Sequence, residues 1–256
     1  MTGPASFPPP RSRPLDTGTA LELLRDGELE IIGRLLASTN NALVGTVTRR
    51  CPDPEPDLVA ACVYKPTIGE RPLDDFPDGT LSHREVAAFL VSESTGWGIV
   101  PPSVYRDGPF GGGMVQLWID VDESVDPVQL VIDGDERLRR VAVFDAAVNN
   151  TDRKAGHLLP IPGGHIHGVD HGVCFSPVPK LRTVLWDWRG EAFAAEELAM
   201  LEALRSDLGG VLGDALCDHL APHEVSAMVR RVERLLKTGR FPQPDPRRPA
   251  LPWPPV

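Results

Sequence analysis

Proline is concentrated at the two ends of the chain, which limits the part that can form regular secondary structure. Five prolines lie within residues 1–14 and seven within 241–256, so these thirty residues hold twelve of the 27 prolines. Proline lacks a backbone N–H and clashes with the preceding helical turn, so clusters of it exclude helix interiors and central strands. We therefore expect residues 1–15 and 241–256 to be disordered, proline-rich tails.

The charge separates along the chain in the same way. The formal net charge is −10, and the thirty terminal residues carry +3, which leaves about −13 on the residues between them. Negative charge of this size repels nucleic acid and anionic lipid surfaces. We therefore expect no nucleic-acid partner and no stable membrane association.

The remaining composition indicates a cytoplasmic protein. No window approaches the roughly 18 apolar residues of a membrane span, and the first residues lack the apolar run of a secretory signal. The four cysteines are widely spaced and form no C-x-x-C pair. Cysteines in this arrangement are typical of a reducing compartment.

Apolar periodicity predicts a β-rich first half and a helical second half. The first half has strand-like runs around a helix that begins near Ser82, where Ser82 and Glu85 have the spacing of a capping box. The expected strands are 29–36, 42–47, 58–64, 96–104 and 114–119, and the expected helices are 20–26, 82–95, 135–148, 196–220 and 222–237. An irregular polar stretch, 149–190, interrupts the helical half, and such stretches commonly carry function.

Two carboxylates in this stretch suit phosphoryl transfer. Asp152 follows a helix that ends in two asparagines, and Arg153 is next to it; Asp170 ends a short strand. One carboxylate can align an acceptor hydroxyl while the other holds magnesium across nucleotide phosphates. Taken singly, each feature also has an ordinary structural interpretation: Asp152 and Arg153 as an ion pair in a turn, and Asp170 as a cap at a strand end. Upstream, Lys65 ends an apolar strand, and Glu85 on the next helix is placed to hold its ammonium group.

These segments resemble the phosphatidylinositol 3-/4-kinase superfamily. The similarity is closest to its type II phosphatidylinositol 4-kinase and HipA-like branch, and to an actinobacterial group of phosphatidylinositol-kinase-like proteins. The segments that carry it are VYKP (63–66), REVAAFLVSESTGWGIVPP (84–102), NNTDRKAGHLL (149–159) and GVDHGVCF (168–175). The resemblance implies a two-lobed, protein-kinase-like fold of the α+β class, with a β-rich N-lobe at 16–118 and a helical C-lobe at 119–240.

The resemblance also implies a role for each site residue in an ATP-dependent kinase. Lys65 is expected to contact the nucleotide phosphates and Glu85 to orient it, while Asp152, with Arg153 beside it, acts on the acceptor and Asp170 binds Mg²⁺. The turn that covers the phosphates corresponds to Ser38, Asn40 and Asn41, and the hinge for adenine to Gln116, Leu117, Trp118 and Ile119. The acceptor is a hydroxyl group of a protein, a small molecule or an inositol lipid.

One residue departs from the family pattern. Five positions after the catalytic aspartate the family has a metal-binding asparagine, and this chain has His157. Imidazole suits Mn²⁺ or Zn²⁺ better than Mg²⁺. His157 therefore leaves three outcomes open: catalysis with one metal ion, a preference for Mn²⁺, or a nucleotide-binding pseudokinase that acts as a scaffold.

A clustering of histidines supports a third, minor interpretation. Four of the seven histidines lie between His157 and His171, and the run from His165 to His171 is one residue longer than the HxHxDH ligand motif of zinc-dependent hydrolases. The extra residue breaks the alternation that would place the first two ligands together. The alternative structural interpretation puts His165 and His167 on an exposed hairpin between two strands.

Overall fold

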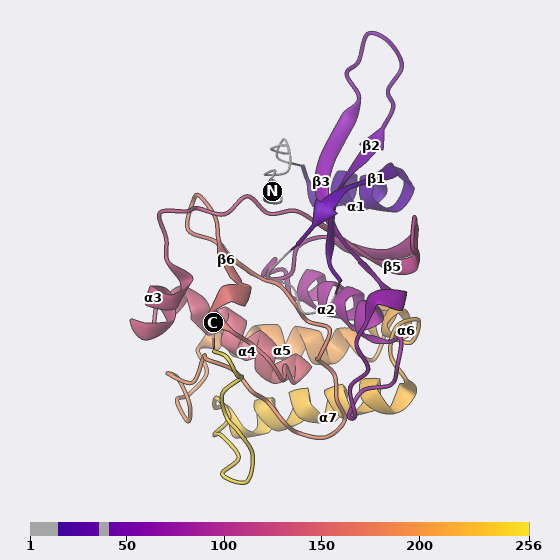
Figure 1. Cartoon of the computed structure of the whole chain (residues 1–256). Coiled ribbons are helices and arrows are strands. Elements are labelled where there is room, and N and C mark those ends of the chain that lie inside the picture. The colour runs from indigo at the N-terminus through magenta and orange to yellow at the C-terminus, as the bar shows by residue number, and fades with distance from the viewer. Residues whose placement is uncertain (1–14, 36–40, 256) are drawn as a thin grey trace.

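A five-stranded antiparallel sheet forms within the first 117 residues (Figure 1). The computed structural model describes residues 15–35 and 41–255. The strand order is β1-β2-β3-β5-β4, which puts the apolar strand β3 at the centre of the sheet. The strands are β1 (Glu28–Arg34), β2 (Leu43–Arg49), β3 (Leu58–Pro66), β4 (Ser103–Gly108) and β5 (Gly111–Leu117).

The first helix gives this sheet a small core of its own. Helix α1 (Thr17–Asp26) begins at Asp16, whose carboxylate accepts a hydrogen bond of 2.9 Å from the Thr19 amide. Leu23 and Leu24 on one face of α1 are buried against β2, β3, β4 and β5. The sheet is therefore covered by an amphipathic helix, as the spacing of its apolar residues requires.

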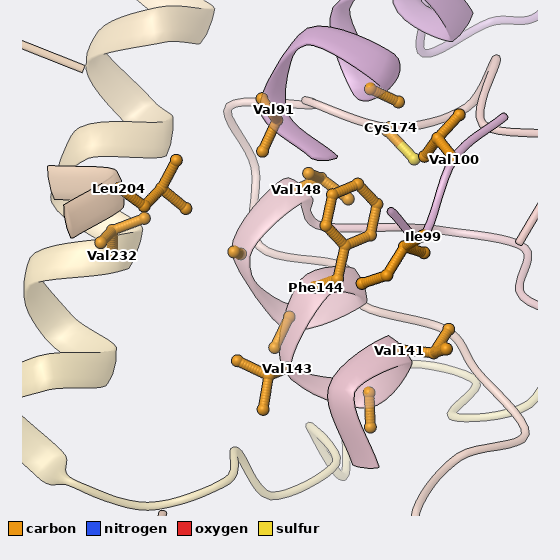
Figure 2. Close-up of a cluster of buried hydrophobic side chains, with 14 of the residues drawn as sticks. Val91, Ile99, Val100, Val141, Val143, Phe144, Val148, Cys174, Leu204 and Val232 are labelled. Carbon is orange, nitrogen blue, oxygen red and sulfur yellow. The ribbon is translucent and has the colours of Figure 1, made fainter. Parts of the chain in front are cut away.

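The other helices surround a larger apolar core. They are α2 (Leu81–Thr95), α3 (Pro127–Ile132), α4 (Arg139–Val148), α5 (Ala195–Asp207), α6 (Val211–Leu216) and α7 (Pro222–Thr238). Figure 2 shows Phe144 of α4 at the centre of this cluster, with Val91 of α2 nearby. Between α4 and α5 lies a small hairpin of β6 (Leu158–Pro160) and β7 (Ile166–Gly168).

Helix α2 joins the two parts because it packs against β4 and β5 as well as α5 and α6. A buried ion pair of 2.6 Å links Arg84 of α2 to Glu224 of α7. The same guanidinium donates a hydrogen bond of 2.9 Å to the carbonyl of Cys174. These contacts fix the helix that carries the neighbouring residue, Glu85.

The predicted mixture of antiparallel sheet and helices is confirmed, with several local corrections. The helix expected over 196–220 is interrupted at Gly209 and Gly210, where two consecutive glycines weaken helix formation. Ser82 and Glu85 do not form the capping box; the Glu70 carboxylate instead accepts the Leu81 and Ser82 amides. None of the described helices is both long enough and apolar enough to span a bilayer.

The C-terminal proline-rich segment, which we expected to be disordered, runs along the surface of the helical part in the structure. The Thr183 amide and the Trp186 indole N–H both donate to the carbonyl of Ala250, at 3.1 and 3.0 Å. The Ala155 amide donates to the carbonyl of Pro255 at 3.0 Å. Proline excludes regular secondary structure here, but its carbonyls remain available as acceptors. The N-terminal tail up to residue 14 lies outside the described residues.

Candidate functional site

Three charged side chains from distant parts of the sequence meet next to the sheet. Lys65 lies near the end of β3, Glu85 on the second turn of α2, and Asp170 just after β7. The Lys65 ammonium forms ion pairs with Glu85 and with Asp170, the latter at 2.9 Å from Nζ to Oδ1. The structure thus brings together the three residues that the sequence singles out for phosphate and metal binding.

Burial and charge control the protonation of this group. Burial alone lowers the pKa of Lys65, but the charges of Asp170 and Glu85 outweigh it and raise that pKa above the usual value. The Lys65 charge holds the pKa of Asp170 far below its usual range. Burial raises the pKa of Glu85, whose Oε2 also accepts the His171 amide at 2.8 Å. Near neutral pH, the site therefore holds a charged lysine and an ionised Asp170.

Asp152 lies on a loop that starts with an unusual backbone conformation. Asn149 ends α4 with a φ of 55°, in the left-handed region that asparagine tolerates. The side chain of Asn150 then accepts the Asp152 amide at 2.9 Å and donates to Asp145 at 3.0 Å. The two asparagines thus turn the chain sharply and fix Asp152 at the start of the loop.

The Asp152 carboxylate is half-buried, and the positive charges of Lys154 and Arg182 act on it. Lys154 lies 3.4 Å away, from Nζ to Oδ2. Burial raises the pKa of Asp152 above its usual value, while the charges of Lys154 and Arg182 act in the opposite direction. A partly desolvated carboxylate in this setting can accept a hydrogen bond from a hydroxyl group and align it.

The side chain of Arg153, expected as a catalytic group beside Asp152, is completely buried. Its guanidinium contacts both oxygens of Asp145 at 2.9 Å, the carbonyl of Val169 at 2.9 Å and the imidazole Nε2 of His171 at 2.6 Å. Arg153 therefore joins the loop of Asp152 to the loop of Asp170. Its side chain has no exposed surface.

His157 lies beside Asp170, as expected for a second metal ligand. Its Nε2 is 3.4 Å from Asp170 Oδ2. Burial lowers the pKa of His157 to about 4, so the imidazole is neutral near pH 7. Its Nδ1 is buried and has no hydrogen-bond partner among the described residues. A neutral imidazole next to an ionised carboxylate is a pair of groups that divalent cations bind.

The residues expected in the phosphate-covering turn and in the adenine hinge lie in different environments. Ser38 and Asn40 lie outside the described residues, whereas Asn41 lines a small pocket together with Lys65, Glu85 and Gly172. In the expected hinge, Gln116 is buried in the sheet, and its amide donates to Ser103 Oγ at 2.8 Å. The remaining hinge residues, Leu117, Trp118 and Ile119, are partly exposed where β5 ends.

Two of the clustered histidines contact each other: the ring centroids of His165 and His167 lie 4.5 Å apart. His165 is exposed at the hairpin tip, as the hairpin interpretation predicts, and contacts the carbonyl of Gly98 at 2.9 Å. His167, expected to be exposed as well, is half-buried within β7. His171 is fully buried against Arg153. Among residues 15–35 and 41–255, no three histidine, cysteine or acidic side chains are arranged to hold a metal ion.

Three features of the site escaped the sequence interpretation: Asp145, Lys154 and the C-terminal segment. Asp145 had a visible signal, because it is a carboxylate within the apolar helical run AVFDAAV. An ionised group at such a position requires a buried partner, here Arg153. Lys154 and the C-terminal contacts depend on side-chain direction and long-range packing, which single-sequence patterns do not contain.

Comparison with known proteins finds a relative that matches most of the chain. No protein-family model matches the chain. Protein Rv2133c of Mycobacterium tuberculosis is 40% identical over 267 residues, which cover 91% of this chain and 94% of that protein. That name specifies no activity.

Proposed function

The chain belongs to the family of Protein Rv2133c, and from its site we propose that it is an ATP-dependent kinase with a hydroxyl group as acceptor. The observation that carries the proposal is the convergence of Lys65, Glu85 and Asp170, with Asp152 on a neighbouring loop. Phosphoryl transfer requires these elements: a cation for the phosphates, a metal-binding carboxylate and a carboxylate for the acceptor. The resemblance to the phosphatidylinositol 3-/4-kinase superfamily supports the same assignment.

The proposal includes a two-lobed arrangement, with the sheet as the N-lobe and the helices after residue 118 as the C-lobe. In support, the sheet and α1 share an apolar cluster of their own, while α2 packs into the larger cluster of the later helices. Lys65 comes from the sheet, and Asp152 and Asp170 come from the helical half. A nucleotide between the two would meet all three side chains.

The residues present fit a divalent cation next to the nucleotide. Asp170 offers an ionised carboxylate and His157 a neutral imidazole, whose Nε2 lies 3.4 Å from Asp170 Oδ2. We assign Mg²⁺ or Mn²⁺ to these two groups. When bound, the ion supplies positive charge that neutralises the phosphate oxygens.

The protein's own residues then perform three tasks. Lys65 binds phosphate oxygens, and Glu85 keeps its ammonium in position. Asp152 orients the acceptor hydroxyl and accepts its proton. Arg153 keeps the loops of Asp152 and Asp170 in register through its buried contacts.

The test is transfer of label from γ-labelled ATP, with Mg²⁺ or Mn²⁺, to a soluble lysate or to lipid vesicles. We expect labelled product with the unmodified protein and none with Asp152→Asn, which still binds ATP. Glu202→Gln is the matched control, since Glu202 is an exposed carboxylate on α5. Full transfer by Asp152→Asn, or no transfer by the unmodified protein with either metal, contradicts the proposal.

A pseudokinase is the second candidate, and His157 is the residue that favours it. ATP binding without any transfer would assign the protein to this class. The variant His157→Asn restores the family's residue and separates the two candidates: gained transfer identifies His157 as the cause of inactivity. Stoichiometric zinc in the purified protein would instead support the hydrolase interpretation.

A further inference from the structure

Arg182 lies beside the loop of Asp152 and is fixed there by its own backbone. Its amide donates to the carbonyl of Asn150 at 2.9 Å, and its carbonyl accepts the Arg153 amide at 3.1 Å. The next residue, Thr183, forms a parallel bridge with Arg153. The backbone of Arg182 is thus hydrogen-bonded to residues on both sides of Asp152, and the Arg182 charge acts on the Asp152 carboxylate.

The guanidinium of Arg182 forms no hydrogen bond or close ion pair with a described residue, although its charge attracts the carboxylate of Asp152. Its Nε is buried without a hydrogen bond, and none of the described carboxylates forms an ion pair with it. Its charge acts on Asp152, whose nearest cation, at 3.4 Å, is Lys154. A guanidinium whose Nε–H is buried and unbonded keeps a donor available for an incoming anion.

The other buried cations near the site are paired with carboxylates, unlike Arg182. The chain has a net charge of −10, and most buried arginines of the site region have carboxylate partners, such as Asp145 for Arg153 and Glu224 for Arg84. Lys65 is likewise paired. Lys154 is paired with Asp152 at 3.4 Å, and Arg182 adds a second positive charge near the same carboxylate.

We infer that Arg182, with Lys154, forms an anion subsite that binds a phosphate ester carried by the acceptor itself. The inference rests on the proposed function, because it makes Asp152 the group that aligns the acceptor hydroxyl. Guanidinium groups bind phosphate oxygens through paired N–H donors, which also orients the ligand. The acceptor is then a compound that contains a hydroxyl and a phosphate ester a few bonds apart.

Glycerol 3-phosphate is a suitable probe because it contains both groups, and glycerol is its neutral counterpart. Binding to the full-length protein is measured by calorimetry. We expect glycerol 3-phosphate to bind, glycerol to show no binding, and Arg182→Gln to weaken glycerol 3-phosphate binding at least tenfold, as for a lost charge-assisted hydrogen bond. Arg182→Lys keeps the charge and restores part of the affinity.

Arg189→Gln is the matched control, since Arg189 is an exposed arginine of the same segment. Thermal melting of each variant separates lost binding from lost folding. Vesicles of phosphatidylglycerol, compared with phosphatidylcholine, test a lipid source of the same phosphate ester. Binding to either probe that depends on Arg182 supports the subsite and identifies its source; equal binding by Arg182→Gln, or none by the unmodified protein, overturns it.

ATP binding and transfer measured on the same samples distinguish this inference from the proposed function. Transfer to an acceptor by Arg182→Gln at the unmodified rate rejects the subsite and leaves the kinase assignment standing. Phosphate-ester binding that depends on Arg182, in a protein that neither binds nor uses ATP, rejects the kinase assignment and leaves the subsite standing.

Discussion

Arg153 and Asp145 form a bidentate ion pair inside the protein, with two N···O distances of 2.9 Å and both side chains fully buried. The pair lies behind the loop of Asp152 and connects that loop to helix α4. Its position explains why an arginine adjacent to the proposed catalytic aspartate does not reach the open side of the site.

Removal of one member of this pair should destabilise the whole protein. Arg153→Met leaves the Asp145 carboxylate buried without its partner, and we expect the free energy of unfolding in urea to fall by about 3–5 kcal/mol. The double variant Arg153→Met, Asp145→Asn should recover part of this loss. Arg140→Met is the control: its pair with Glu196 is exposed, and its loss should cost less than about 1 kcal/mol.

Lys65→Met should affect ATP binding and stability separately. Glu85 loses its cation and stays buried, so we expect lower stability as well as loss of ATP binding. Adding Glu85→Gln removes the buried charge and should restore thermal stability without restoring ATP binding. Recovery of both by the double variant would contradict the role of Lys65.

The rate of transfer should rise with pH as Asp152 becomes ionised. Burial raises the pKa of this carboxyl, and Lys154 opposes the shift. Lys154→Gln removes a charge that lowers the pKa of Asp152, so this pKa should rise further. The acid limb of the pH–rate profile should therefore move to higher pH. A limb that stays in place would exclude Asp152 as the titrating group.

Stability should decrease in mild acid because histidines are buried in the neutral form. Burial lowers the pKa of His167 to about 4, and that of the fully buried His171 far below its usual value. As the pH falls below about 6.5, the unfolded chain binds protons that the folded protein does not, so stability is lost between about pH 6.5 and 4. The slope is roughly 1.4 kcal/mol per pH unit for each histidine. Urea unfolding at several pH values measures it, and His167→Gln should reduce the slope.

The contact between Trp186 and the C-terminal segment gives a further test. Trp186→Phe removes the indole N–H that donates to Ala250, and we expect a loss of about 1 kcal/mol. Amide hydrogen exchange at Thr183 and Ala155 should become faster, since both amides bond to this segment. Trp253→Phe is the control because Trp253 is 87% exposed. Unchanged exchange in Trp186→Phe would show that the segment does not hold the loop.

The sequence predicted the parts of the site that depend on residue type and spacing. Lys65 at the end of an apolar strand, Glu85 on the next helix and Asp170 after a short strand all lie where those patterns place them. Whether they bind a nucleotide stays a prediction, and so does the domain boundary near residue 118.

Side-chain direction and long-range packing escaped prediction. Whether Arg153 faces the interior depends on Asp145, on the preceding helix α4, so the neighbouring side chains of Asp152 and Arg153 differ in exposure. The C-terminal segment was misjudged for a related reason. Proline prevents helix and strand, but a chain without either can still pack in a fixed, extended path.

The bond between Ala155 and Pro255 also has a consequence for biosynthesis. The two residues are one hundred positions apart, so the loop between Asp152 and His157 gains this contact only after residue 255 has left the ribosome. The sheet and α1, whose partners lie within the first 117 residues, can fold much earlier. A nascent chain should thus acquire its sheet early in translation and complete the proposed catalytic loop only after residue 255 has emerged, which delays any activity until then.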